Sequence, residues 1–434
     1  MTRSRFLLTA CSSGAGKTTL TLALLRAYKE RGIKLAPFKV GPDYIDPLWH
    51  AAAAGVPSYN LDGWLLEPPV LRALLGSSIP PGGLAIIEGV MGLYDGLGAS
   101  DVASSAHVAR LTDSPVVLLV DGRGMALSVA AVVKGFRDLD PRLNMGGVIV
   151  NRLSSAAHYG LIKEAVEKRV GLPVLGWLPE VPDLALESQE LGLRPPLHCP
   201  SLQERLTRLA NIAAQHIDLE KLGSMTASPL KGHLPLIEPV GRVRVAMARD
   251  AAFSAYDEGS LQLWRSLGAE LIPFSPLEDG ELPKGVQALL LCGSGTARYA
   301  VDLARNRAMC ATIGSSTLPL WAEGLGAAYV GRELDGLPLC GLLEHRSFSW
   351  EKMVAFGYVE TDLGRAQEYR YLGGEIAGAN VWARRAGGKG NVWLCGRHEP
   401  GLHVFWPHTQ AWTNPRLVRD FLSWARERGS RIHN

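Results

Sequence analysis

Residues 6–19 read Phe6-Leu-Leu-Thr-Ala-Cys-Ser-Ser-Gly-Ala-Gly-Lys-Thr-Thr19, and an amphipathic stretch, Thr18–Arg31, continues from them. The order is a short apolar strand, a glycine-containing loop and a helix, which is typical of a phosphate-binding P-loop. Gly14 and Gly16 let the backbone approach a phosphate, so that successive N–H groups and the helix start point at the anion. The sequence therefore predicts a nucleotide-binding loop.

The loop supplies the groups that hold the phosphates. We assign nucleotide binding to eight consecutive residues: Ser12, Ser13, Gly14, Ala15, Gly16, Lys17, Thr18 and Thr19. In this motif the lysine reaches the β- and γ-phosphates, and the Thr18 hydroxyl ligates Mg²⁺. The consensus has glycine where this chain has Cys11. The alternative is a glycine turn beside a solvated lysine, and the strand–loop–helix order argues against it.

The pattern around the loop predicts an α/β fold with two domains. Up to about Ile217, apolar β-rich runs alternate with amphipathic stretches, which is typical of a parallel sheet covered on both faces. The predicted strands are Phe6–Thr9, Leu35–Val40, Leu84–Glu88, Val116–Val120, Gly147–Asn151 and Val174–Leu178. We expect a P-loop, doubly wound parallel sheet over residues 1–222, a Gly/Pro-rich linker over 223–240 and a second α/β domain over 241–434.

Composition excludes several classes of protein. The chain has 434 residues and a net charge of +3, with no basic tract for nucleic acid. No apolar run approaches the ~20 residues of a membrane helix, so we expect no membrane partner. The six cysteines contain no CxxC pair, which argues against a disulfide framework or a zinc site and indicates a cytoplasmic protein.

Acidic residues follow the predicted strands beside the loop. Asp43 and Asp46 come after the second strand, and Glu88 ends the third, where an unpaired charge would be costly. Ligands bind at the carboxyl ends of parallel strands, where carboxylates can complete an Mg²⁺ shell. We therefore predict that carboxylates at these strand ends complete an Mg²⁺ shell together with Thr18. The alternative for both aspartates is an Asx turn beside proline.

Several stretches together resemble one known family. They include KVGPDYIDP (39–47), EGVMGLYDG (88–96), VDGRGMALS (120–128), GVIVNRL (147–153) and LALESQELGL (184–193). In order, they are similar to the cobyrinic acid a,c-diamide synthases, and the likeness covers nearly the whole chain. Members amidate peripheral acetates of a corrinoid, and relatives act on sirohaem-type or nickel-sirohydrochlorin rings.

The resemblance implies an ATP-dependent amidoligase with ATP and Mg²⁺ as cofactors and a tetrapyrrole as substrate. It implies that the acetate is first converted to an acyl phosphate, which ammonia attacks. The implied catalytic residues are Lys17, Lys39, Asp46 and Asp95, and the implied metal ligands are Thr18, Asp43 and Glu88. Lys39 would neutralise the acyl phosphate, while Asp46 and Asp95 would orient substrate or accept a proton from ammonium. The first domain would be dethiobiotin-synthetase-like, and the assembly could be a homodimer.

The second half resembles the family's class I glutaminase domain but departs from it. Gly324 stands at the position of the nucleophilic cysteine, and a glycine has nothing to activate. The oxyanion strand end reads Cys292-Gly-Ser-Gly-Thr-Ala297, and of the family's H-x-H pair His408 remains while the second position is Gln410. We expect this domain to lack glutaminase activity, so that nitrogen comes from ammonia, free or delivered by a partner protein.

Two alternatives belong to other classes. One is a non-catalytic tetrapyrrole-binding or regulatory protein, and the other is a P-loop ATPase of the partitioning type. The intact loop and the acidic set argue against the first, because a pure binder needs no Mg²⁺ ligands. The glutaminase-like half argues against the second. Residue identity does not choose between corrinoid and sirohaem-type rings.

Overall fold

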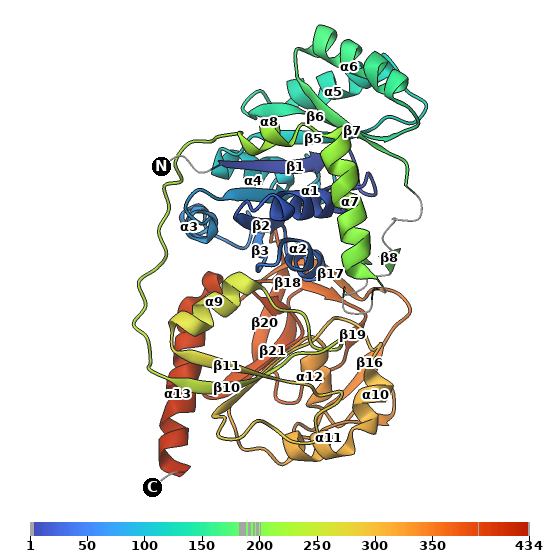
Figure 1. The fold of residues 1–434 in the computed structure, drawn as a ribbon. Helices are drawn as coiled ribbons and strands as arrows, with labels where there is room; N and C mark the ends of the chain where they lie inside the picture. The colour runs from blue at the N-terminus through green and yellow to red at the C-terminus, as the bar shows by residue number, and fades with distance from the viewer. Residues whose placement is uncertain are drawn as a thin grey trace. The chain divides into compact units, whose positions relative to one another are not determined.

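The computed structural model describes residues 4–181, 188–189, 192–193, 196, 199, 201–388 and 390–432. The chain forms two compact units, residues 1–234 and 235–434. Residues 227–242, between α8 and β10, form neither helix nor strand (Figure 1). Residues 184–187 and 190–191, which belong to the LALESQELGL stretch of the resemblance, lie outside the described residues.

Unit 1 alternates strands and helices along the chain. Its elements are β1 (Ser4–Ala10), α1 (Lys17–Glu30), β2 (Leu35–Val40), α2 (Asp46–Ala54), β3 (Tyr59–Leu61), α3 (Pro68–Ser78), β4 (Leu84–Glu88), α4 (Ser105–Thr112), β5 (Val116–Asp121), α5 (Ser128–Leu139), β6 (Met145–Leu153), α6 (Ala156–Val170), β7 (Val174–Pro179), β8 (Ser188–Gln189), β9 (Gly192–Leu193), α7 (Leu202–His216) and α8 (Leu219–Gly223). Seven strands form one sheet in the order β3-β2-β4-β1-β5-β6-β7. All its pairs are parallel, which confirms the predicted fold class.

Both faces of this sheet are covered because its strands are apolar throughout. On β5, Val117 and Leu119 pack into a core with α1, α2 and α7, while Leu118 and Val120 pack into a second core with α5 and α6. The alternation follows the period of two along a strand. The helices lie on the two sides of the sheet accordingly (Figure 1). β1 and β4 are neighbours in the middle, so their carboxyl ends share one edge.

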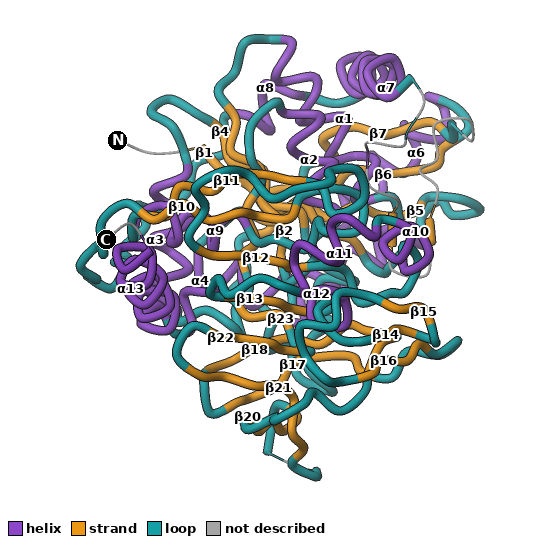
Figure 2. The backbone as a smooth tube through the Cα atoms, turned by 90° about the horizontal axis from the view of Figure 1, so that it is seen from below, coloured by secondary structure: helices purple, strands orange, loops and turns teal. Residues whose placement is uncertain are grey.

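Unit 2 combines a parallel and an antiparallel half. Its elements are β10 (Val243–Ala248), α9 (Glu258–Ser266), β11 (Ala269–Phe274), β12 (Ala288–Cys292), α10 (Ala300–Arg305), α11 (Arg307–Gly314), β13 (Leu320–Glu323), α12 (Leu325–Tyr329), β14 (Glu333–Leu334), β15 (Leu337–Pro338), β16 (Arg346–Ser349), β17 (Ala355–Thr361), β18 (Gly364–Arg370), β19 (Leu372–Gly373), β20 (Val381–Arg385), β21 (Trp393–Glu399), β22 (Leu402–Phe405), β23 (His408–Thr409), a 3-10 turn (Ala411–Thr413) and α13 (Pro415–Ile432). The large sheet has the order β11-β10-β12-β13-β22-β21-β20-β17-β18-β23. Figure 2 shows β10, β12 and β13 one after another.

One predicted strand of unit 2 is divided in the structure. The run Phe405–His408 suggests a single strand, but β22 ends at Phe405 and β23 begins at His408. Pro407, which lies between them, has no N–H to give to a ladder. The break lets β23 leave β22 and pair with β18, where Gln367 lies opposite His408.

Candidate functional site

The P-loop spans residues 11–16, between the end of β1 and the start of α1. Gly14 and Gly16 have φ values of 72° and 97°, in the left-handed region that favours glycine. A Cβ at Gly16 would also overlap Asn151 Nδ2. No side chain caps the start of α1, so its first N–H groups face the loop. This geometry suits an anion, as the sequence predicts.

The departure at Cys11 is compatible with this loop. The backbone there does not have the positive φ that a glycine would provide. The side chain packs partly into the core of α5 and α6. Burial raises the pKa of the Cys11 thiol to about 11, so it stays protonated at neutral pH. A cysteine therefore serves here as a small apolar residue.

Lys17 is the first residue of α1 and lies under the loop. Its Nζ donates to the Ser12 carbonyl at 3.1 Å, and the residue is 8% exposed. Burial, with Lys39 nearby, lowers the pKa of Lys17 to about 8. The loop residues Ser12, Ser13 and Gly14 are exposed. A lysine with one carbonyl partner beside an exposed loop is suited to exchange that partner for phosphate oxygens.

Glu88 stands at the centre of a buried polar cluster. Its Oε1 accepts from Thr18 Oγ1 and from Lys39 Nζ, both at 2.8 Å, and its Oε2 lies 2.7 Å from His50 Nε2. Glu88 itself is 0% exposed. Lys39 also pairs with Asp46 Oδ2 at 2.6 Å. The structure thus gathers Thr18, Lys39, Asp46 and Glu88 at the carboxyl ends of β2 and β4.

Opposite charges in this cluster favour the ionised forms of Glu88 and Lys39. Burial opposes the charge on Glu88, but Lys39 and His50 hold the pKa of its carboxyl well below its usual range. Burial likewise works against the Lys39 ammonium, and Asp46 and Glu88 raise its pKa above the ordinary lysine value. Burial and the neighbouring Asp43 raise the pKa of Asp46 to about 6.

Asp43 and Asp95 hold turns rather than the cluster. Asp43 Oδ1 accepts from the N–H groups of Ile45 and Asp46 at the start of α2, which is the Asx-type turn that the sequence leaves open. Asp95 Oδ2 accepts from the Gly92 N–H at 2.9 Å. The structure therefore brings two of the three predicted metal ligands together, Thr18 and Glu88.

The Mg²⁺ site can be tested on the donors that are present. Within the described part of the chain, no group of three or more His, Cys, Asp or Glu side chains could hold a metal ion by itself. Mg²⁺ however takes only one or two protein oxygens in nucleotide sites and draws the others from phosphates and water. A Thr18 hydroxyl in contact with the ionised Glu88 fits that requirement.

Three residues near the loop escape sequence reasoning. Asn151, at the end of β6, donates from Nδ2 to the Ala15 carbonyl at 2.8 Å. Arg152 donates to the Gly14 carbonyl at 2.7 Å and pairs with Asp121. His50 binds Glu88 from α2. The signal for Asn151 and Arg152 is their place at the end of a strand, and for His50 it is the spacing of four from Asp46 on one helix face.

In unit 2, Gly324 forms a sharp elbow between β13 and α12. Its φ of 59° and ψ of −122° are accessible to glycine and strained for other residues. A Cβ there would lie 2.6 Å from the Gly293 carbonyl oxygen and 2.7 Å from His408 Nε2. The predicted nucleophile position therefore faces His408, but the space beside it is closed.

Glu323, next to the elbow, links the groups around it. Its Oε1 accepts from Trp321 Nε1 at 2.9 Å and from Thr409 Oγ1 at 2.5 Å. Its Oε2 lies 3.5 Å from His408 Nδ1. Despite burial, His403 and His408 hold the pKa of Glu323 well below its usual range. The His408 imidazole and the Glu323 carboxylate thus lie together beside a position that has no nucleophile, and sequence reasoning missed the carboxylate.

Neither of the other predicted remnants completes this centre. Gln410 donates to Asp257 Oδ2 at 3.1 Å and accepts from the Trp412 N–H, so it holds the turn before α13. Cys292 is 5% exposed, and its Sγ lies 3.8 Å from Glu323 Oε2. Burial and Glu323 raise the pKa of this thiol well above its ordinary value. Cys292 is therefore unsuited to replace the missing nucleophile.

We expect Gly324→Cys to destabilise unit 2 without creating a glutaminase. The strained backbone alone costs about 1–3 kcal/mol for a residue with a Cβ, and the Gly293 carbonyl would have to move. The measurement is calorimetric unfolding together with glutamate release from glutamine. Gly336→Ala is the matched control, because Gly336 has φ 77° and its Cβ would meet nothing within 4 Å among the described residues. A Gly324→Cys protein that unfolds like this control and releases glutamate would contradict the expectation.

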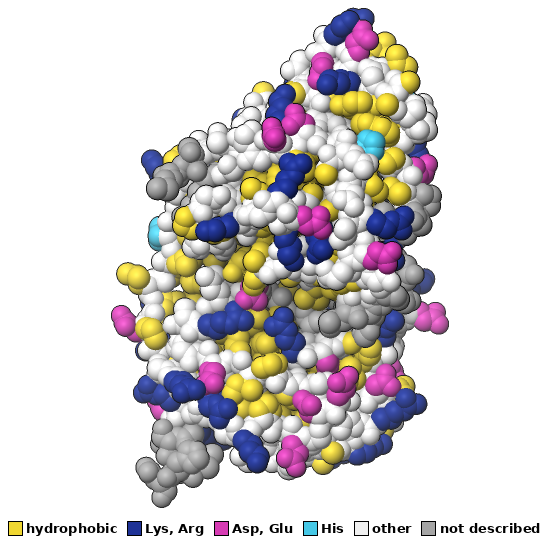
Figure 3. All heavy atoms as spheres, in the orientation of Figure 1, with side chains coloured by type: hydrophobic (Ala, Val, Ile, Leu, Met, Phe, Trp, Pro, Cys, Tyr) yellow, Lys and Arg dark blue, Asp and Glu magenta, His cyan; other side chains and the backbone are white. Residues whose placement is uncertain are grey.

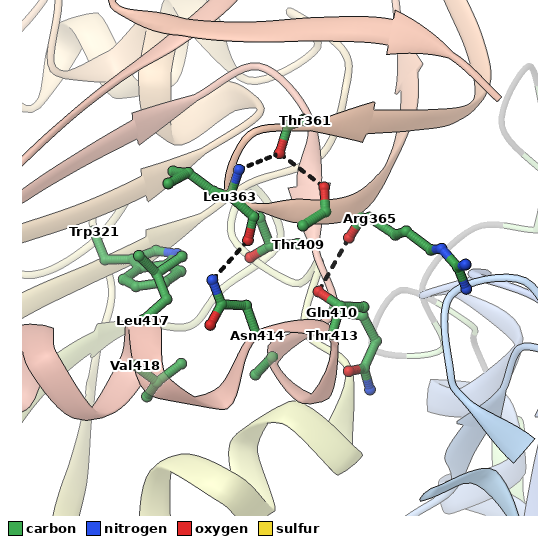
Figure 4. A pocket seen from close by; sticks show the side chains of 12 residues that line it. Trp321, Thr361, Leu363, Arg365, Thr409, Gln410, Thr413, Asn414, Leu417 and Val418 are labelled. Atoms are coloured by element: carbon green, nitrogen blue, oxygen red, sulfur yellow. Dashed lines mark hydrogen bonds between the residues drawn. The ribbon is translucent and has the colours of Figure 1, made fainter. Parts of the chain in front are cut away.

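A small pocket of unit 2 lies beside β23 and α13 (Figure 4). Its walls are closed by their own hydrogen bonds, from Asn414 Nδ2 to the Leu363 carbonyl and from Thr413 Oγ1 to the Arg365 carbonyl. It contains no pair of a nucleophile and a base. We assign it no part in the chemistry.

Figure 3 shows basic and acidic side chains interspersed over the face drawn. In the described residues, every helix is too short or too polar to cross a bilayer.

Comparison with known proteins identifies the class first. Residues 6–192 match the CobQ/CobB/MinD/ParA nucleotide-binding domain family, in agreement with the P-loop and the parallel sheet of unit 1. Unit 1 is therefore a nucleotide-binding domain of that class.

Sequence identity to curated relatives then identifies the family of the whole chain. The chain is 40% identical to a cobyrinate a,c-diamide synthase of Listeria monocytogenes, over 82% of this chain and 81% of that protein. It is 35% identical to one of Salmonella typhimurium, over 97% of this chain and 98% of that protein. The chain belongs to the cobyrinate a,c-diamide synthase family, whose members are amidoligases, and the resemblance found in the sequence is confirmed.

Proposed function

We propose that this protein amidates peripheral acetates of a corrinoid acid in an ATP-dependent reaction, with ammonia rather than glutamine as the nitrogen source. The contact between Thr18 and Glu88 beside the P-loop carries the proposal, because it gives a chain of this family the donors for a nucleotide-bound Mg²⁺. Relatives named for cobyrinate support the substrate class.

The proposed reaction has two steps. An acetate oxygen attacks the γ-phosphorus of ATP and ADP leaves, which gives an acyl phosphate. Ammonia then attacks the acyl carbon and phosphate leaves, because phosphate is a far better leaving group than oxide. Phosphoryl transfer depends on positioning and charge neutralisation more than on a protein nucleophile.

In this proposal the loop N–H groups and Lys17 bind the phosphates and neutralise charge on the transferred group. Thr18 and Glu88 would hold Mg²⁺, which supplies further charge neutralisation when bound. Asp46 and Asp95 would orient the substrate or accept a proton from ammonium. Lys39 would act by balancing Asp46 and Glu88, since direct contact with an acyl phosphate requires breaking both ion pairs.

The nitrogen source provides the test. With ATP, Mg²⁺ and a cobyrinic acid substrate, we expect the purified protein to form amide with ammonium and none with glutamine, measured by mass spectrometry. The reason is that Gly324 has no side-chain nucleophile with which to release ammonia from glutamine. The attacking species is neutral NH₃, so the rate at fixed total ammonium should rise with pH through the alkaline range while amine supply is limiting.

Three controls separate the parts of this proposal. A sirohaem-type acid in place of the corrinoid tests the ring. Ammonium without ATP tests whether the reaction depends on ATP, and release of ADP tests the acyl phosphate route. The ammonia reading is falsified if the protein alone releases glutamate from glutamine, since a nucleophile would then exist elsewhere.

A further inference from the structure

His50 on α2 is a buried polar residue that the proposed function leaves unassigned. The inference about it rests on the proposed function of the P-loop site. His50 is 0% exposed and makes two side-chain contacts. Its Nε2 lies 2.7 Å from Glu88 Oε2, and its Nδ1 lies 3.2 Å from Ser58 Oγ. A hydroxyl that donates to Nδ1 leaves the proton on Nε2, where it faces the carboxylate.

The two oxygens of Glu88 have different neighbours. Oε1 receives both Thr18 and Lys39, whereas Oε2 has His50 as its short contact. Removal of that donor would leave a buried carboxylate oxygen without its bond, which is costly. The carboxylate would then turn to share its remaining donors, and Oε1 would leave the Thr18 hydroxyl.

Helix α2 delivers two groups to this cluster. Asp46 and His50 are four residues apart and share one face of the helix. Asp46 reaches Lys39, and His50 reaches Glu88, so that α2 holds both ends of the chain Asp46–Lys39–Glu88–His50. Trp49, Ala53 and Ala54 of α2 pack in one core with α1, which holds α2 beside the P-loop helix.

We propose that His50 is a positioning residue, which fixes the rotation of Glu88 so that Oε1 faces Thr18 and the metal–phosphate site. His50 touches neither nucleotide nor metal in this role. Partners that orient a ligating carboxylate typically contribute 10–100-fold to metal affinity or activity. The effect should therefore appear in Mg²⁺ dependence rather than in nucleotide binding as such.

Two substitutions divide the contacts of His50. Gln places its amide nitrogen near the former Nε2 and can still donate to Glu88, whereas Asn places it near the former Nδ1 and keeps only the Ser58 contact. Both remove the ring from the same buried position. If His50 had only a structural role, both variants would lose stability, and the Mg²⁺ dependence of ATP binding would be the same in His50→Gln and His50→Asn.

The experiment is calorimetric titration of ATP into the full-length protein at a series of Mg²⁺ concentrations, with thermal melts in parallel. In His50→Asn we expect the Mg²⁺ concentration for half-maximal effect to rise about 10–100-fold, while ATP affinity in EDTA stays at the wild-type value. In His50→Gln we expect the Mg²⁺ dependence to stay close to wild type.

The proposal is overturned if ATP binding depends on Mg²⁺ equally in the two variants. It is also overturned if ATP binding by the wild-type protein does not depend on Mg²⁺. Should His50→Asn unfold, His50→Leu provides a second arm, because it fills the buried position without a donor to Glu88 and should raise the Mg²⁺ requirement as expected for His50→Asn. The readout uses no amidation. A wild-type protein that binds ATP with Mg²⁺ but forms no amide would refute the proposed function and leave this inference standing.

Discussion

Lys17→Ala should lower kcat/KM for ATP-dependent amidation by about 10²–10³-fold or more, the cost of removing one donor aimed at transition-state charge. In the absence of nucleotide its Nζ binds only the Ser12 carbonyl among the contacts described, so the loop loses little on substitution. The fold should therefore persist, since glycines and backbone form the turn. Steady-state kinetics and ATP titration would measure the effect.

Lys29→Ala is the matched control for this variant. Lys29 lies near the other end of α1, is exposed and carries the same charge. We expect its kinetics to match wild type and the melting temperatures of the two variants to agree closely. If Lys17→Ala kept the wild-type rate of turnover, Lys17 would not be the phosphate-binding lysine.

The sheet of unit 1 is predictable because its strands are buried on both faces and read as continuous apolar runs. β2 and β4 agree with the predicted bounds, and β6 is longer than predicted, Met145–Leu153. The edge strand β3 has three residues, too few for a periodic pattern. The antiparallel strands of unit 2 were not predicted. β17 has an exposed Phe356 on its outer face, so the polar–apolar alternation that marks such strands is blurred.

The candidate site is predictable to the extent that it depends on strand ends. Thr18, Lys39, Asp46 and Glu88 meet because β1, β2 and β4 are neighbours whose carboxyl ends share an edge. Asp43 is an exception, because it precedes the start of a helix and its carboxylate accepts hydrogen bonds from N–H groups there. His50 could not be found this way, because it lies within α2 rather than at the end of a strand.

Glu88→Gln is the second large effect that we expect. The substitution keeps the shape of the side chain but removes the charge that Lys39 and a bound Mg²⁺ require. Lost stabilisation of several kcal/mol corresponds to roughly 10²–10³-fold or more in rate. Breaking a buried ion pair also costs about 3–5 kcal/mol of stability, so thermal melts must accompany the kinetics.

The two consequences of Glu88→Gln can be separated. Thr18→Val removes the hydroxyl without disturbing the ion pair, so it should lower the rate and weaken Mg²⁺ dependence while the melting temperature stays near wild type. Glu164→Gln, an exposed position on α6, controls for the loss of one negative charge.

Because Glu88 has a depressed folded-state pKa, its contribution to stability is present above the unfolded glutamate pKa of about 4.3 and is lost as the pH falls below it. The stability difference between wild type and Glu88→Gln should therefore shrink on acidification. A difference that is unchanged from neutral to strongly acidic pH, with unaltered Mg²⁺ dependence, would show that this carboxylate is neither paired nor part of a metal site.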